Sequence, residues 1–187
     1  MKLTNYSDFN FNVGIYEEML TPEIQLNLCK DLLPYFKDKT KRTNILFGNE
    51  GLVYTTNYRG KTNNRKVLAW TEVPLLNDLR SYIQSLMLKD EKCSDELTVC
   101  VVQLYPNGKA MIKPHRDKEM VKGTRILGVS IGATREITFS YFERSHEISL
   151  RTGSMYVMRP PTNDKWLHSI PESDTKEPRL SLTFRTY

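Results

Sequence analysis

Apolar residues recur at helical spacing in two segments of the first half of the chain. Residues 21–36 open with Thr21, a favourable N-cap residue, and with Pro22 at the first helical position. Residues 71–89 carry a longer stripe, in which apolar side chains return every three or four positions. The stripe comprises Leu75, Leu79, Tyr82, Ile83, Leu86 and Met87. We expect both segments to be helices that pack on a core.

After about Leu97 the pattern changes to short runs of β-branched and aromatic residues, separated by turn residues such as Pro106-Asn107-Gly108. The runs are residues 97–105, 125–133, 136–142, 146–150, 154–158 and 179–187. Short strands at this spacing predict a sandwich or a jelly roll. We therefore expect one α+β domain over residues 1–187, with helices and a loop-rich region in 1–96 and a β core in 97–187.

The last run alternates strictly between apolar and polar side chains. The apolar row comprises Leu180, Leu182 and Phe184, and the polar row comprises Arg179, Ser181, Thr183 and Arg185. Alternate residues of a strand point to opposite faces, and a face with two guanidinium groups is costly to bury unless an anion meets it. Either residues 179–185 form an edge strand whose polar face is in contact with water, or the polar row holds a carboxylate ligand. Gln103 and Tyr105, which share a face of another predicted strand, would extend such a cradle.

The composition is that of an ordinary globular protein, with 187 residues, 39% of them hydrophobic and 26% charged. Three cysteines without a C-x-x-C pair argue against a disulfide framework or a thiolate zinc site. The first residues contain no apolar signal core, and no apolar run approaches the roughly 20 residues of a membrane span. We therefore expect an intracellular, soluble protein without a membrane-spanning segment.

The excess positive charge is concentrated in one segment. The net charge is +5, and residues 37–66 alone hold eight basic and two acidic residues, a balance of +6. Phe47, Tyr54 and Tyr58 lie among these charges. Interleaved basic and aromatic residues suit a polyanion with exposed bases, but a solvated basic loop has the same composition. Composition alone leaves both interpretations open.

One histidine and one aspartate, His115 and Asp117, are separated by a single residue. Residues i and i+2 of a strand point to the same face, so this pair can present an imidazole and a carboxylate to one ion. His168, on another predicted strand with an apolar flank, is the candidate third ligand. Two histidines and one carboxylate form the facial triad of non-haem Fe(II) oxygenases, whereas the alternative is a solvated charged turn. We expect His146, between charged residues, at the surface.

Seven short motifs follow one another from about Phe47 to Tyr187. They are FGNEGLVYT, VVQLYPNG, HRDKE, VSIGATREITF, TGSMYVM, WLHSIP and PRLSLTFR. Their order and spacing resemble the AlkB family of Fe(II)/2-oxoglutarate dioxygenases. The resemblance implies a double-stranded β-helix, which is an open jelly roll, with N-terminal helices packed on one side. It also implies Fe(II), 2-oxoglutarate and O₂ as cofactors.

By position, the resemblance implies that His115, Asp117 and His168 are the iron ligands. Arg179 matches the arginine that pairs with the far carboxylate of 2-oxoglutarate, and Arg185 matches a second, catalytic arginine near the keto-acid end. The expected cofactor-binding residues are Gln103, Tyr105, Arg179, Ser181, Thr183 and Arg185. The family usually has asparagine where Gln103 and Ser181 stand, and both changes alter the reach of a hydrogen-bonding group.

The resemblance is closest to nucleic-acid-repair members of the family. It implies oxidative demethylation of N-alkylated bases in DNA or RNA, with release of formaldehyde and conversion of 2-oxoglutarate to succinate. The resemblance implies that Tyr58, or alternatively Tyr54, stacks on the target base and that Glu119 lies near the base edge. With the cations of the basic segment, the expected substrate-binding residues are Tyr54, Tyr58, Arg59, Lys61, Arg65 and Glu119. Two alternatives are an oxygenase acting on protein side chains and a nucleic-acid-binding module without turnover. The basic, aromatic segment argues against the first, and the complete ligand set argues against the second.

Family members that repair duplexes carry an additional hairpin with an apolar wedge ahead of the substrate lid. Here residues 38–46 lead directly into residues 47–55, which leaves little room for that hairpin. Ile45, Leu46 or Phe47 would either form a minimal wedge or begin a core strand. Without a wedge, opening a duplex costs about a few kcal/mol that binding must supply. We therefore expect a preference for single strands. We also expect the protein to be a monomer.

Overall fold

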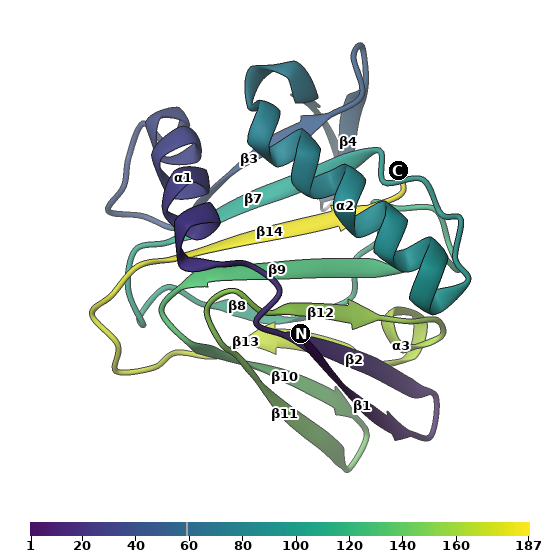
Figure 1. Ribbon diagram of the computed structural model, residues 1–187. Coiled ribbons are helices and arrows are strands. Elements are labelled where there is room, and N and C mark those ends of the chain that lie inside the picture. The colour runs from purple at the N-terminus through teal and green to yellow at the C-terminus, as the bar shows by residue number, and fades with distance from the viewer. Residues whose placement is uncertain (59) are drawn as a thin grey trace.

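Three sheets form the framework of the structure, which is a computed structural model (Figure 1). The structure describes residues 1–58 and 60–187, without the side chains of Asn57 and Tyr58. Within those residues the largest sheet has eight strands, in the order β1 (Lys2–Asp8), β2 (Phe11–Glu17), β12 (Met155–Met158), β9 (Ile126–Gly132), β14 (Arg179–Arg185), β7 (Val99–Tyr105), β3 (Thr43–Gly48) and β6 (Leu68–Ala69). The second sheet comprises β11 (Arg144–Leu150), β10 (Arg135–Tyr141), β13 (Leu167–Ile170) and β8 (Ile112–His115). The third is the hairpin of β4 (Val53–Tyr58) and β5 (Lys61–Lys66).

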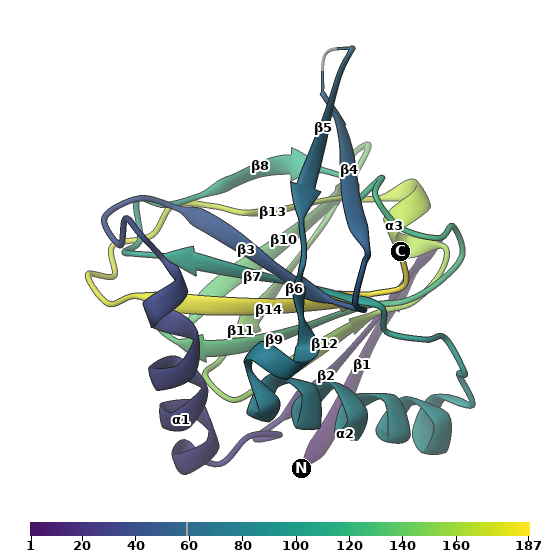
Figure 2. The same ribbon diagram turned by 90° about the horizontal axis from the view of Figure 1, so that it is seen from above.

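The elements lie in layers. Helices α1 (Pro22–Leu32) and α2 (Pro74–Glu91) cover one face of the large sheet, and β8 and β13 lie on its other side, from which the β4–β5 hairpin projects (Figure 2). One apolar cluster packs the helices on the large sheet, and a second one fills the space between the two sheets. The expected jelly roll with helices on one side is confirmed, and the interior between its sheets is where β14 presents its polar row.

Both predicted helices form, with shifted ends. The Thr21 side chain accepts a hydrogen bond from the Ile24 backbone N–H and caps α1, which ends at Leu32 and continues as a 3₁₀ turn over Leu33–Tyr35. The second helix begins at Pro74, after a 3₁₀ turn over Trp70–Glu72. The expected stripe of α2 was wrong in one position, because Tyr82 is 48% exposed.

Leu76 takes that place in the core of α2. Its side chain is fully buried, together with Leu79 and Ile83, so the buried positions follow the spacing i, i+3, i+7. Tyr82 lies beside this stripe, where a long amphipathic ring reaches solvent.

Strands precede the helices, which differs from the expected order of helices first. Residues 2–17 form β1 and β2, and β2 pairs with β12, so the hairpin extends the large sheet at its edge. Because β1 has no further neighbour in the described part of the chain, most of its side chains are exposed. An exposed polar strand lacks the clear alternation of a half-buried one, so its sequence carries little signal.

The last strand occupies the middle of the large sheet. β14 pairs with β7 on one side and with β9 on the other over its whole length. Arg179 and Arg185 are 2% and 6% exposed. The wet-edge interpretation of the polar row was therefore wrong, and two buried guanidinium groups face the interior of the jelly roll.

The possible wedge residues belong to the core. Leu46 and Phe47 are buried on β3, which pairs with β7, and Ile45 packs partly against the main apolar cluster. The core-strand interpretation of this segment is confirmed. No helix among the residues described here is long and apolar enough to cross a membrane.

Candidate active site

Three side chains that were predicted as metal ligands meet between β8 and β13. His115 ends β8, Asp117 follows two residues later, and His168 lies on β13 directly opposite His115 in the strand pairing. One ligand atom from each of the three lies within 4.8 Å of the other two. The two imidazole rings are 4.3 Å apart between centroids. This arrangement of two nitrogen donors and one carboxylate suits a ferrous ion.

The two histidines differ in their surroundings. His115 Nδ1 lies 2.9 Å from the carbonyl oxygen of Lys113, so a proton on Nδ1 would leave Nε2 as the ligand atom, 3.4 Å from Asp117 Oδ1. His168 is 7% exposed, and burial lowers its pKa to about 4. Its Nδ1 has no hydrogen-bond partner among the described residues. A neutral, buried imidazole with an unused nitrogen is ready to bind a metal ion.

Asp117 is held in its ionised form and in a fixed orientation. Burial by itself would raise the pKa of Asp117, but the charge of Arg185 and the hydrogen bond with His115 outweigh it, so the pKa lies well below its usual value. Arg185 Nη2 lies 3.1 Å from Asp117 Oδ2. The predicted catalytic arginine is therefore in direct contact with a predicted iron ligand.

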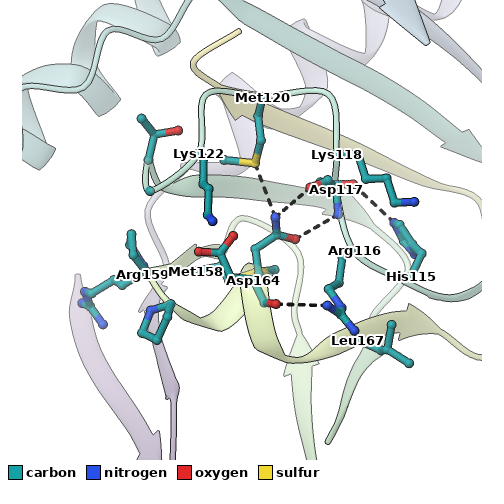
Figure 3. A pocket seen from close by; sticks show the side chains of 15 residues that line it. His115, Arg116, Asp117, Lys118, Met120, Lys122, Met158, Arg159, Asp164 and Leu167 are labelled. Carbon is teal, nitrogen blue, oxygen red and sulfur yellow. Dashed lines mark hydrogen bonds and ion pairs between the residues drawn. The ribbon is translucent and has the colours of Figure 1, made fainter. Parts of the chain in front are cut away.

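Asn163 holds the main chain of Asp117, and sequence reasoning missed it. The backbone N–H of Asp117 donates to Asn163 Oδ1 at 2.9 Å, and Asn163 Nδ2 donates to the Asp117 carbonyl oxygen at 2.8 Å (Figure 3). Asn163 lies in the short helix α3 (Thr162–Lys165), just before His168. Nothing in the sequence around Asn163 indicates this contact, because it spans 46 positions.

The polar row of β14 forms one wall of the interior. Arg179 Nε donates to Ser130 Oγ at 2.7 Å, and Arg179 Nη2 donates to Ser181 Oγ at 3.4 Å. The guanidinium lies 5.1 Å from the centroid of the Tyr105 ring, and the Tyr105 hydroxyl donates to Gln103 Oε1 at 3.1 Å. Five hydrogen-bonding side chains thus converge, including Ser130 on β9, which the sequence analysis did not consider.

Arg179 is also the part of this wall that still lacks a partner. Burial lowers its pKa, yet a guanidinium stays charged at any physiological pH. Its Nη1 is buried and has no hydrogen-bond partner within the described chain, and the same holds for Nε of Arg185. Buried, unpaired cationic donors are costly, so the wall fits an anionic ligand such as a dicarboxylate.

The metal site and the polar wall share one cavity of about 240 Å³. Its lining includes His115, Asp117, His168, Gln103, Tyr105, Arg179, Ser181, Thr183 and Arg185. Tyr156, on β12, also lines it, and burial raises the pKa of Tyr156 to about 12. A Cβ at Gly128 would lie 2.1 Å from the Tyr156 ring, so the glycine on β9 makes room for that ring. The sequence pattern predicted a role in the site for neither Tyr156 nor Gly128, because a tyrosine in an apolar strand is usually a core residue.

The predicted substrate residues separate into three groups. Tyr54, Arg65 and Glu119 line the same cavity. Lys61 is exposed on β5 and does not line the cavity. The side chain of Tyr58 and all of Arg59 lie outside the described residues.

Three contacts fix the hairpin over the cavity. Tyr54 is 5% exposed, and its ring centroid lies 4.7 Å from that of Tyr187. The Thr55 backbone N–H donates to the Tyr187 hydroxyl at 2.7 Å. Arg65 Nη2 donates to the carbonyl oxygen of Asn44 at 3.1 Å. The hairpin is therefore tied from β4 to Tyr187, which lies two residues after β14, and from β5 to β3 of the large sheet.

A second, larger hollow of about 680 Å³ lies beside the cavity and shares His115 and Asp117 with it (Figure 3). Arg116, Lys118 and Lys122 line it, and Arg116 Nη1 donates to the carbonyl oxygen of Asp164 at 3.1 Å. The metal site is thus open to two hollows, one lined by the buried arginines and the other by exposed cations.

His146 is less exposed than expected. Its ring stacks on Phe11 with 4.5 Å between centroids, and its Nε2 lies 3.0 Å from Asp8 Oδ2. Its side chain is 31% exposed, so the surface prediction was only partly right. His146 fastens the β1–β2 turn to β11 and takes no part in the site.

Known proteins resemble this chain in sequence or in fold. The chain matches the 2OG-Fe(II) oxygenase superfamily over residues 12–185. It is 32% identical over 157 residues to "DNA oxidative demethylase ALKBH2" of Mus musculus, which covers 77% of this chain and 61% of that protein. It is 33% identical over 119 residues to "Alpha-ketoglutarate-dependent dioxygenase alkB homolog 3" of Bos taurus, which covers 54% of this chain and 41% of that protein.

A solved structure described as "The structure of OsALKBH1" aligns over 100% of both chains, with a TM-score of 0.63 and 12% identity. At that identity the likeness shows the shared fold alone. The chain spans less than two thirds of the length of the two curated relatives.

Proposed function

The chain belongs to the 2OG-Fe(II) oxygenase superfamily, and from its AlkB-like site we propose that it demethylates N-alkylated bases of DNA or RNA. Proteins described as a DNA oxidative demethylase and as an α-ketoglutarate-dependent dioxygenase are among its curated relatives. The observation that carries the proposal is the buried row of Arg179 and Arg185 facing the His-Asp-His group within one cavity. Such a cavity suits a metal ion and a carboxylate ligand side by side.

His115, Asp117 and His168 would hold the ferrous ion, and Arg179 with Tyr105 and Ser181 would hold the distal carboxylate of 2-oxoglutarate. When bound, iron and 2-oxoglutarate supply the oxidising chemistry: 2-oxoglutarate and O₂ give succinate and carbon dioxide, and one oxygen atom goes to the substrate methyl group. The resulting N-hydroxymethyl group loses formaldehyde and leaves the unmodified base.

The chain's own residues contribute positioning and electrostatics. Arg185 keeps Asp117 ionised and turned towards the histidines. The Lys113 carbonyl oxygen orients the ring of His115 through Nδ1. The apolar side chains between the sheets keep the interior poor in water, so these charges act at short range with little screening. Preorganised groups of this kind stabilise charge without rearranging during the reaction.

The β4–β5 hairpin and its neighbours would receive the substrate. Tyr54, Arg65 and Glu119 already line the cavity, and we propose that Tyr58, Arg59 and Lys61 contact the strand outside it. A base must leave its stack to reach the metal site. Because the candidate wedge residues belong to the core strand β3, where Leu46 and Phe47 are buried and Ile45 is partly buried, we propose that single strands are the preferred substrate. We also propose that one copy suffices, since all of the named groups come from one chain.

Product analysis tests the proposal. The protein would be incubated with Fe(II), 2-oxoglutarate, ascorbate and a panel of methylated single-stranded oligonucleotides, and succinate, formaldehyde and the repaired base would be measured. Turnover should require the methyl group and should vanish in His168→Ala. Succinate formation driven by a protein substrate instead would favour the side-chain oxygenase. Tight oligonucleotide binding without any succinate would favour a binding module.

A further inference from the structure

Three aromatic side chains, two exposed and one partly buried, form a ridge at one end of the molecule. Phe9 lies in the β1–β2 turn, and Tyr141 and Phe142 lie at the β10–β11 turn; we call these three residues the aromatic ridge. Figure 1 shows the two turns next to each other, below α3. The Tyr141 ring centroid is 4.7 Å from that of Phe142 and 6.2 Å from that of Phe9. Phe142 is 91% exposed and Phe9 is 58% exposed.

The position of Phe142 is unfavourable in two respects. It is one of two residues that connect the paired residues Tyr141 and Arg144, and its φ is +51°. Hairpin turns of this length favour glycine or asparagine there, because a Cβ strains a backbone with positive φ. A phenylalanine at this point also exposes nearly its whole ring to water. Neither packing nor turn geometry explains the residue, which directs attention to binding.

The ridge is firmly anchored. The Tyr141 ring lies 5.5 Å from that of Trp166, and Trp166 is fully buried and donates from Nε1 to the carbonyl oxygen of Phe9 at 3.1 Å. Both turns are thereby fixed to the same core residue. A rigid aromatic surface loses little conformational entropy when a flat ring stacks on it.

Hollows connect the ridge with the metal site. Phe9, Tyr141 and Phe142 line a hollow of about 500 Å³, and Tyr141 and Phe142 also line a second one of about 450 Å³ that reaches Arg116 and Leu167. Arg116 and Leu167 in turn line the larger hollow that shares His115 and Asp117 with the cavity (Figure 3). We call this series of three hollows, which share residues from one to the next, the track.

The track carries an excess of positive charge. Arg144, Arg159 and Asp117 line it but are paired with Asp8, Glu91 and Arg185, respectively. The other charged residues that line the three hollows are Arg116, Lys118, Lys122 and Lys165, against Asp164 and Glu143. The four cations outnumber the two anions, and they lie beside exposed aromatic rings. This combination suits a phosphate backbone that carries unpaired bases.

We infer that the track binds the single-stranded nucleic acid that flanks the target base, and that one flanking base stacks on Phe142. The inference rests on the proposed function for the direction of the nucleic-acid strand. The strand would leave the metal site past Arg116 and reach the ridge. In a duplex the ring faces are covered by stacking on the neighbouring base pairs, so the ridge selects unpaired strands. The occupant is a nucleic acid because phosphate charge and base stacking are both matched along one continuous path.

Affinity for an unmodified strand tests the inference without any turnover. Anisotropy of a labelled single-stranded oligonucleotide of roughly 12 residues should show a Kd at least about fivefold higher for Phe142→Ala than for the wild type. Phe142→Trp should retain or improve binding. Leu88→Ala, at a leucine that is 59% exposed on α2, is the matched control and should leave the Kd unchanged. An unchanged Kd in Phe142→Ala, or an equal loss in the control, would overturn the inference.

Crosslinking locates the contact. Oligonucleotides with 5-iodouracil at successive positions would be irradiated with the wild-type protein and digested with trypsin, which cuts after Arg135 and Arg144. One position should crosslink to the peptide of residues 136–144, which contains Tyr141 and Phe142. Crosslinks confined to other peptides would refute the stacking.

Turnover separates this inference from the proposed function. Phe142→Ala should demethylate a methylated trinucleotide as the wild type does, while its KM for the longer strand rises. A wild type that demethylates both substrates with no effect of Phe142→Ala would contradict the track alone. A wild type that binds strands through Phe142 but demethylates nothing would contradict the proposed function alone.

Discussion

Removing the guanidinium of Arg179 should weaken the binding of 2-oxoglutarate far more than it affects the KM for the oligonucleotide. Arg179→Ala takes away a side chain that is 2% exposed and whose Nη1 has no partner in the described chain. Its Nε and Nη2 donate to Ser130 and Ser181, so the fork is already oriented before a ligand arrives. The binding of a carboxylate at Nη1 would therefore cost little conformational entropy of the arginine side chain.

The size of the effect follows from the kind of bond that is lost. A hydrogen bond between charged groups contributes about 1.5–3 kcal/mol, and every 1.4 kcal/mol changes an equilibrium constant about tenfold. The Kd of 2-oxoglutarate should thus rise about ten- to a hundredfold. The KM for the oligonucleotide should stay nearly constant, because Arg179 lies on the inner wall and not at the hairpin.

Calorimetric titration of 2-oxoglutarate under anaerobic conditions, with Mn(II) in place of Fe(II), measures this Kd directly. Arg179→Lys should fall between the wild type and Arg179→Ala, since an ammonium keeps the charge but loses the fork. Arg80→Ala removes another partly buried arginine, which lies 5.0 Å above the Trp70 ring and away from the cavity, and should leave the Kd unchanged. An Arg179→Ala variant that is folded and binds 2-oxoglutarate like the wild type would refute the assignment of the polar wall.

Four other outcomes are expected. Asn163→Ala removes both hydrogen bonds to the main chain of Asp117 and should weaken metal affinity about tenfold in a Mn(II) titration, with the melting temperature as its control. Metal-free wild type should lose about 2 kcal/mol of stability relative to His168→Gln between pH 7 and pH 4.5, measured by urea unfolding. The sign follows because burial lowers the folded pKa of His168 to about 4, so only the unfolded chain takes up its proton as the pH falls through 6.5. Replacing Lys61 and Arg65 by glutamine should reduce the salt dependence of single-strand binding by a log–log slope of about 0.7 per lost phosphate contact, and an unchanged slope would place the strand elsewhere. The same methylated base should be repaired faster in a single strand than in a duplex at matched salt, and equal rates would show that another element opens the duplex.

Local patterns in the sequence predicted most strands after Leu97 and the donors of the site. The alternation in residues 179–185 places both arginines on one face whatever lies around the strand, because successive side chains of a strand point in opposite directions. The spacing of His115 and Asp117 keeps both groups near each other, but β8 ends at His115, and Asn163 and Arg185 hold Asp117 in place beyond it. The polar strand at residues 2–8 escaped notice, since an exposed edge imposes no alternation on its sequence.

Partners that are distant along the chain could not be predicted in this way. Ser130 reaches Arg179 across 49 positions, and Asn163 reaches Asp117 across 46. Each is an ordinary polar residue in its own segment, so no local signal distinguishes it. The same is true of Tyr156, whose place beside the cavity depends on the absence of a side chain at Gly128 on the neighbouring strand.

The sequence by itself therefore determined which groups are available and which of them share a face. Only the tertiary structure decided that β14 is a central strand, that its arginines are buried, and that β13 places His168 opposite His115. The physical reason is the range of the forces involved. Side-chain direction within a strand is set by covalent geometry over two residues, whereas the neighbours of a strand are set by the burial of apolar surface from the whole chain.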